Sequence, residues 1–196
     1  HFYERLKGGG IAVRGLVVNR VQPRVCPEDN EAVPSDPAEA GLLLRPDDTA
    51  WNAMVVGALA EAGIVFERSD YLVEARRTAK FLITSLRSDG RLLRTYRDGV
   101  AKLPGYLEDY AFLVEALITL YEATLERVWL SHAHTLATEM IDLFWDVQEG
   151  TFFDTARDHE KLIVRPRDVF DNALPSGSSM AAIGLFRLGI ILTERK

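Results

Sequence analysis

The chain has 196 residues, 47% of them apolar, which is enough for one domain with a substantial core. Its formal net charge of -6 argues against a general affinity for nucleic acid or anionic membranes, because both need a concentrated positive field. Cys26 is the only cysteine, which excludes an internal disulfide, a paired-cysteine redox motif and a cysteine-rich zinc site, and makes a reducing cytoplasm the expected location.

Residues 1–46 form an irregular N-terminal segment. They hold three consecutive glycines and five prolines among mixed charges, a composition that breaks regular structure. A strand is expected at most over residues 11–18. The glycine run is not a phosphate-binding loop, because no Lys-Ser/Thr pair follows it. Since the chain begins with His1 rather than Met, we expect it to be processed, trimmed or part of something longer.

Residues 47–196 form a helical domain, because apolar residues recur there at helical spacing. Three of its five expected helices are apolar on nearly every side, and two carry one apolar stripe opposite charged residues. The two kinds alternate, which predicts buried inner helices paired with solvent-facing outer helices. The inner helices are expected over about 51–62, 107–121 and 178–192, and the outer helices over about 72–86 and 129–144.

The linkers between these hairpins are expected to form short β-ribbons. Residues 92–96 and 100–103 flank Asp98-Gly99, a strong turn signal. Residues 151–153 and 162–165 are the candidates for a second ribbon. The predicted fold class is therefore all-α, an αα-hairpin array with β-ribbons in the linkers. The longest apolar stretch, residues 184–192, is interrupted by Arg187 and is too short for a membrane span.

Antiparallel hairpins bring the N-termini of all inner helices to one end of the array. That end would collect partial positive charge and unpaired N–H groups, which suits polar or anionic ligand groups. Glycosidic chemistry uses two carboxylates roughly 5 to 9.5 Å apart across a sugar. The candidate catalytic residues at these helix starts are Glu108, Asp109 and Asp171. The candidate ligand-binding residues are Asp48, Trp51, Asn52, Tyr106, Tyr110, Arg97, Arg165 and Ser176.

Each candidate also has a structural interpretation. Asp48 and Ser176 lie where helix caps are favoured regardless of function. Glu108 and Asp109 are adjacent and point about 100° apart on a helix, so one of them is expected to be structural. The aromatic candidates could pack in the core instead of stacking on a sugar. The arginines could be solvated or paired with carboxylates instead of clamping a ligand.

No metal site or cofactor is indicated. His132 and His134 are two residues apart on an outer helix and cannot share a face to bind a metal. His159 lies in a charged loop with no evident partner for a role as a base.

Several ordered motifs carry a family resemblance over about residues 46–196. They include Asp47-Asp48-Thr49-Ala50-Trp51-Asn52, Tyr96-Arg97-Asp98-Gly99, Pro104-Gly105-Tyr106-Leu107-Glu108-Asp109-Tyr110, Gly150-Thr151-Phe152-Phe153 and Asp171-Asn172-Ala173-Leu174-Pro175-Ser176-Gly177. In these motifs the chain resembles the helical region of the DUF255, or YyaL-like, family, also called spermatogenesis-associated protein 20-like. The chain departs from the family pattern before Trp51, where the Lys expected after the paired aspartates is absent.

The resemblance implies an N-terminal thioredoxin-like domain, which this chain lacks, followed by an (α/α)6 toroid of the six-hairpin glycosidase type, similar to N-acylglucosamine 2-epimerases. A closed toroid needs twelve helices, whereas five are expected here and the last has no outer partner. The chain is therefore predicted to be a partial toroid. Either it is a fragment of a longer chain, or another copy covers its inner helices in a homo-oligomer, or it is an open array with a large apolar surface.

Two functions are compatible with these features. The first is a non-catalytic carbohydrate-binding or scaffold module, favoured because an incomplete ring places few groups opposite one another. The second is a sugar-active enzyme, a glycoside hydrolase or an epimerase, that uses carboxylates at the inner-helix starts. Carboxylates from different inner helices that lie within glycosidase distance and line a water-filled cleft would favour the enzyme, whereas the same carboxylates engaged as caps and in ion pairs would favour the module.

Overall fold

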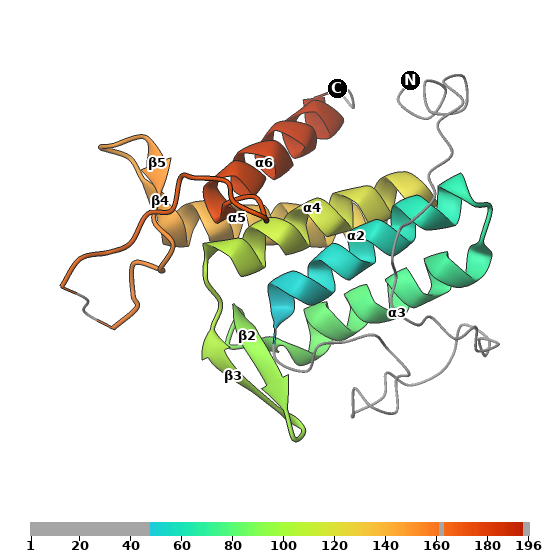
Figure 1. The fold of residues 1–196 in the computed structure, drawn as a ribbon, viewed down its shortest axis with the longest axis horizontal. Helices are drawn as coiled ribbons and strands as arrows, with labels where there is room; N and C mark the ends of the chain where they lie inside the picture. Colours follow the sequence, from blue (N-terminus) through green and yellow to red (C-terminus); the bar gives the residue numbers. More distant parts are fainter. Residues whose placement is uncertain (1–47, 161–162, 194–196) are drawn as a thin grey trace.

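A computed structural model describes residues 48–160 and 163–193 (Figure 1). All five expected helices are present, and the fold is mostly helical as predicted. The irregular N-terminal segment, including the strand expected within it, lies outside the described residues. The helices are α2 (Thr49–Val65), α3 (Ser69–Ser85), α4 (Leu107–Thr124), α5 (Arg127–Phe144) and α6 (Gly177–Thr193).

The helices form two layers, and α4 lies at the centre of the inner one. Helix α4 packs against α2 on one side and α6 on the other, while α3 covers α2 and α5 covers α4. The three inner helices run in the same direction, and the two outer helices run back (Figure 1). The predicted alternation of inner and outer helices is therefore confirmed, and it follows from where the apolar residues lie.

Small residues let the inner helices approach closely. A Cβ atom on Gly57 of α2 would lie 3.9 Å from the Cα of Ala116 on α4, and one on Gly184 of α6 would lie 3.2 Å from Val114 Cγ1. The core around these contacts is continuous from Val56 on α2 to Leu188 on α6. Burial of this apolar surface is what holds the hairpins in one array.

The first linker forms the expected ribbon. Strands β2 (Arg91–Arg97) and β3 (Val100–Pro104) pair antiparallel, with Arg97 opposite Val100. Asp98 and Gly99 connect them and both have positive φ, 51° and 77°, as a two-residue hairpin turn requires. A short strand that the sequence did not suggest, β1 (Arg87–Ser88), adds to the other edge of β2.

The prediction for the second ribbon was wrong in its pairing. Strand β5 (Thr151–Phe152) pairs with β4 (Trp145–Asp146), which directly follows α5. A partner over residues 162–165 is not formed, because residues 163–165 have no strand structure and residue 162 lies outside the described residues. The tight turn at Gly150, which has φ 64°, brings the nearer segment into register first.

The last helix has no outer partner among the described residues, and one side of it is apolar and exposed. Ile183, Phe186 and Ile190 recur at helical spacing, and Phe186 is 70% exposed. We call these three residues the apolar face of α6. Across the described part of the chain, no helix is both long and apolar enough to span a membrane.

Replacement of Gly177 by Ala tests the approach of α6 to α4. An added Cβ would lie 3.1 Å from the Glu108 backbone N and 3.2 Å from Leu107 Cγ, so we expect a loss of about 1 kcal/mol in the free energy of unfolding. Gly189→Ala is the matched control on the same helix, because its Cβ would meet no described atom within 4 Å. That control should gain up to about 1 kcal/mol in helix propensity. Equal effects in urea denaturation would contradict the close packing.

The apolar face of α6 leads to a second prediction. In solution the chain should either self-associate or bind an apolar dye at this face. Phe186→Glu should weaken the self-association or the dye binding, whichever of the two is observed. Sedimentation velocity and dye fluorescence provide the two readouts, and a monodisperse monomer that binds no dye would contradict the prediction.

Candidate functional site

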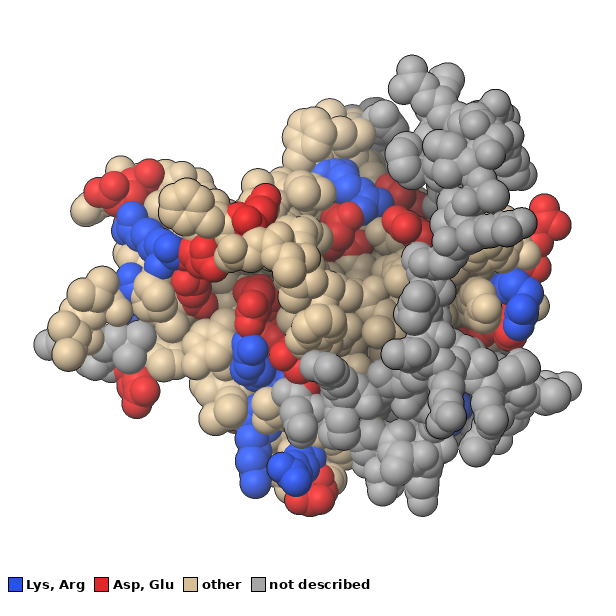
Figure 2. All heavy atoms as spheres, in the orientation of Figure 1, with Lys and Arg blue, Asp and Glu red and all other residues tan. Residues whose placement is uncertain are grey.

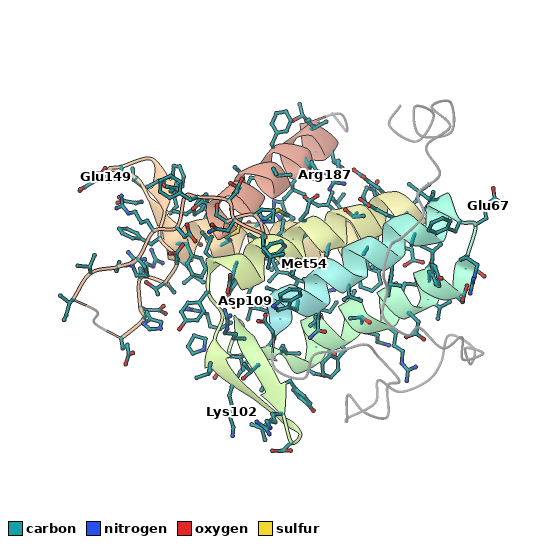
Figure 3. All side chains as sticks on the ribbon, viewed as in Figure 1. Met54, Glu67, Lys102, Asp109, Glu149 and Arg187 are labelled. Atoms are coloured by element: carbon teal, nitrogen blue, oxygen red, sulfur yellow. The ribbon has the colours of Figure 1, made fainter. Side chains whose placement is uncertain are left out.

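The N-termini of α2, α4 and α6 meet at one end of the array, as predicted (Figures 1 and 3). The backbone N of Ala50 on α2 donates to Asp109 Oδ1 on α4 at 3.2 Å. Gly177, the first residue of α6, contacts the backbone of Glu108 on α4. The ribbon is fastened to the same end, because the hydroxyl of Thr49 donates to the carbonyl oxygens of Leu93 and Arg94 at 2.8 Å each.

Asp109 is the buried centre of this junction, and its side chain is 0% exposed. Its second oxygen, Oδ2, accepts from the backbone N of Tyr106 at 2.8 Å and from Arg94 at 3.2 Å. Desolvation raises the pKa of Asp109 to about 7, against the opposing effect of Arg94. Asp109 is thus the member of the Glu108–Asp109 pair that holds the structure together.

Arg94 is a residue of this junction that the sequence analysis missed. From strand β2 its guanidinium lies 2.7 Å from Glu108, 3.2 Å from Asp109 and 3.6 Å from Asp48. It also lies over the ring of Tyr106, 4.9 Å from the ring centroid. A single guanidinium therefore lies within ion-pair distance of three carboxylates, which come from the starts of two inner helices. The sequence feature that could have identified it was a charged residue between Leu92 and Tyr96 in a predicted β-ribbon.

The caps expected at the helix starts are present. Asp48 caps α2, since its Oδ1 accepts from the backbone N of Ala50 and of Trp51. Ser176 caps α6 through Oγ, which accepts from Ser179 N at 3.1 Å. Asp171 accepts from the backbone N of Ser176 at 2.9 Å, and this hydrogen bond lowers the pKa of Asp171. The unpaired N–H groups expected at this end are thus met in part by the chain's own side chains.

A cavity of about 700 Å³ opens beside these N-termini. Its walls are the start of α4, the segment 154–160 after β5 and the segment 166–177 that leads into α6. Its carboxylates are Glu108, Asp154, Glu160 and Asp168, and its rings are Tyr106, His159 and Phe170. Of the predicted residues, the cavity brings together Glu108, Tyr106 and Ser176.

Asp154 is a second residue that the sequence analysis missed. Its Oδ2 accepts from the backbone N of Asp168 at 2.9 Å, and its carbonyl oxygen accepts from Leu107 N at the start of α4. Desolvation raises the pKa of Asp154, and the neighbouring charges of Asp168 and Glu108 raise it further against the hydrogen bond from Asp168. The available signal was its place directly after a strand-like stretch.

Thr155, the next residue, also lines the cavity. It is 3% exposed, and its hydroxyl has no hydrogen-bond partner among the described residues. A buried hydroxyl without a partner costs free energy, and this one has almost no accessible surface, so it is not a contact point for a ligand in the cavity. Within the described residues, no three His, Cys, Asp or Glu side chains are grouped so as to hold a metal ion.

The other predicted residues lie elsewhere. Tyr110 is 0% exposed, and its hydroxyl accepts from Leu92 N at 2.9 Å, so it belongs to the core. Arg97 is at the tip of the ribbon, with its side chain 75% exposed. Arg165 lies over the ring of Phe153, at 3.8 Å, and donates to the Thr155 carbonyl oxygen. Trp51 is 40% exposed and Asn52 is buried, both in the first turn of α2.

Solved structures share this architecture. The chain superposes on cellobiose 2-epimerase from Spirochaeta thermophila with a TM-score of 0.57 and 19% identity, over 72% of this chain and 38% of that one. It superposes on D-mannose isomerase with a TM-score of 0.55 and 16% identity, over 73% and 38%. The layered hairpins therefore define a six-hairpin glycosidase-like α/α toroid, of which the described residues form a part.

Sequence comparison defines the relationship more narrowly. The chain is 38% identical to spermatogenesis-associated protein 20 of Rattus norvegicus and 37% identical to that of Homo sapiens, each over 150 residues and 71% of this chain. An uncharacterised protein of Caenorhabditis elegans is 28% identical over 156 residues, or 76% of this chain and 21% of that protein. The chain is thus related to the spermatogenesis-associated protein 20-like family, which confirms the resemblance. No protein-family profile matches it.

The match covers only part of these relatives. The chain spans about a fifth of the length of the curated relatives it matches, 19% for both spermatogenesis-associated protein 20 sequences. What the whole proteins do therefore extends to this chain only as a proposal.

The pKa of Asp109 predicts how stability depends on pH. In the unfolded chain this carboxyl ionises near pH 3.8, whereas in the folded chain it holds its proton up to about pH 7. Between these pH values the folded state binds one more proton than the unfolded state. The free energy of unfolding should therefore fall progressively as pH rises from about 4 through 7. Wild type and Asp109→Asn should be compared by urea denaturation across this range.

The informative quantity is the difference between the two free energies of unfolding. The stability of wild type relative to Asp109→Asn should fall as pH rises, because the variant has no carboxyl to ionise. A pH-independent difference would show that Asp109 keeps an ordinary pKa in the folded chain.

Proposed function

We propose that this part of the toroid is a carbohydrate-binding module whose site is the cavity at the inner-helix N-termini. The observation that carries the proposal is the mixed lining of the cavity, in which rings lie beside carboxylates and an amide. Sugars offer apolar ring faces that stack on aromatic side chains and hydroxyls that need both donors and acceptors. A cavity of about 700 Å³ is within the range of small-molecule sites.

Binding without turnover is favoured by what the other carboxylates do. Asp48, Asp109 and Asp171 are all engaged as caps or in hydrogen bonds at the helix starts. A group used in this way is held fixed and is costly to withdraw from its partners. This arrangement supports a recognition or scaffold role for the junction itself.

Phe170→Ala tests the binding proposal. Phe170 lines the cavity and is 76% exposed, so its removal should leave the fold intact. We expect the affinity for a bound mono- or disaccharide to fall about tenfold, or about 1.4 kcal/mol, through loss of stacking. Phe186→Ala is the matched control, because Phe186 is 70% exposed and lies on α6 outside the cavity lining.

The ligand would first be found by a thermal-shift screen of sugars and sugar phosphates, and its affinity measured by calorimetry. If Phe170→Ala and Phe186→Ala both bound the ligand as tightly as wild type, the site would not be this cavity. If no sugar bound to the chain at all, the proposal would fail.

A sugar-active enzyme, a glycoside hydrolase or an N-acylglucosamine 2-epimerase-like protein, is the second candidate. It is favoured by one observation, the raised pKa of Asp154 in a cavity that Glu108 also lines. General acid–base chemistry uses two carboxyl groups whose environments differ, and Asp154 is the one whose pKa is raised by desolvation. Asp154→Asn should then abolish turnover and retain binding, whereas a chain that binds sugars and never transforms them supports the module.

The remaining parts of the family architecture are also proposals. As in the DUF255 arrangement, the longer protein would carry a thioredoxin-like domain before the toroid and would act in the cytoplasm.

A further inference from the structure

The charged side chains that line the cavity are all acidic. Glu108, Asp154, Glu160 and Asp168 line it, and no Lys or Arg does so among the described residues. Segments 154–160 and 163–177 also lie close to arginines, and their charges add to those of the lining.

Among the described residues, Arg167, Arg91 and Arg94 have carboxylate partners, whereas no ion pair is formed by Arg165, which donates to the Thr155 carbonyl oxygen, or by the exposed Arg157. Arg167 lies 2.6 Å from Asp146 and 4.0 Å from the ring centroid of Phe153, and Arg165 lies over the same ring. Arg91 is bound to Asp158. Arg94 is shared among Glu108, Asp109 and Asp48, so it balances one of these three carboxylates when all are ionised. Figure 2 shows acidic and basic side chains close together over the linkers on this side of the molecule.

The helix N-termini do not reverse this balance. Side-chain oxygens of Asp48, Asp109, Asp171 and Ser176 already accept hydrogen bonds from N–H groups at the starts of α2, α4 and α6. The partial positive charge that would attract an anion is therefore offset by the chain's own side chains. Of the polar or anionic ligand groups that the sequence led us to expect at this end, the acidic lining of the cavity favours the polar ones.

From the four carboxylates of the lining, which includes no Lys or Arg among the described residues, and from the rings of Tyr106 and Phe170 beside them, we propose that the cavity takes a cationic sugar, one that carries a free amine, in preference to neutral or phosphorylated sugars. This inference rests on the proposed function and names the substrate class of the same site. An ammonium group placed among Asp154, Asp168 and Glu160 gains charge-assisted hydrogen bonds.

The test compares four probes of similar shape with the full chain by calorimetry: glucosamine, glucose, N-acetylglucosamine and glucose 6-phosphate. The measurements are made at about pH 6.5, where an amine of ordinary pKa is mostly charged. Glucosamine should bind at least tenfold more tightly than glucose or N-acetylglucosamine, and glucose 6-phosphate should bind most weakly. The preference for glucosamine should shrink as salt is added, because the attraction is electrostatic.

Two variants locate the charge. Glu160→Gln removes an exposed carboxylate of the lining, and Asp154→Asn removes the desolvated one. Each should lower the affinity for glucosamine several-fold and change the affinity for glucose little. Glu67→Gln is the matched control, because Glu67 lies in the turn between α2 and α3 at the opposite end of the array (Figure 3). If Asp154→Asn unfolds the chain, Glu160→Gln still decides the result.

The outcomes separate the two proposals. If the neutral sugars bound as tightly as glucosamine and Phe170→Ala weakened them, the binding site would stand and the cationic preference would be overturned. Tightest binding of glucose 6-phosphate would overturn it equally. If none of the four probes bound, although other sugars did in the screen, the amine preference would fail alone. Glucosamine binding that neither Glu160→Gln nor Phe170→Ala altered would place the ligand elsewhere and overturn both.

Discussion

The junction at Asp109 is the constraint on which the rest of the site depends. This one buried carboxyl joins the start of α2 through Ala50 N, the start of α4 through Tyr106 N and the ribbon through Arg94. Hydrogen bonds fix the relative positions of these three backbone segments in a way that the hydrophobic effect alone does not, because hydrogen bonds are directional and the hydrophobic effect is not. The cavity lies against this junction, since Tyr106 and Glu108 belong to both. The wall of the cavity formed by the start of α4 is therefore fixed by the hydrogen bonds of Asp109.

The sequence predicted the layers well and the site only in part. Helices and their alternation follow from where the apolar residues lie along the chain, so local pattern was sufficient for all five. The first ribbon was equally local, because Asp98-Gly99 specifies its own turn. The second ribbon was assigned the wrong partner strand. The sequence of residues 151–153 does not show whether they pair with the residues before them, at Trp145, or with the residues after them, at 162–165.

Long-range contacts explain what the sequence could not give. From the sequence alone, Arg94 has the pattern of a solvent-exposed strand residue, and only the fold shows that it contacts the starts of α2 and α4. Asp154 likewise has the pattern of a loop residue, and only the fold places it near the charges of Asp168 and Glu108. The roles of Glu108 and Asp109 could be separated only as alternatives, since helical geometry shows that they diverge but not which one is buried. Their exposures, 45% and 0% for the side chains, decide the matter.

The cavity is formed by fewer elements of the toroid than the site that was expected from the sequence. Carboxylates from different inner helices were expected to face each other, yet Asp48 and Asp109 meet at Arg94. The cavity is walled instead by the start of α4 and by the linker that leads into α6, without a contribution from α2. A site of this kind can form without closure of the ring. Catalysis needs groups held opposite one another on both sides of the reacting bond, whereas recognition needs only one well-formed wall and its rim. The local construction of the cavity is therefore the strongest reason to assign binding before chemistry.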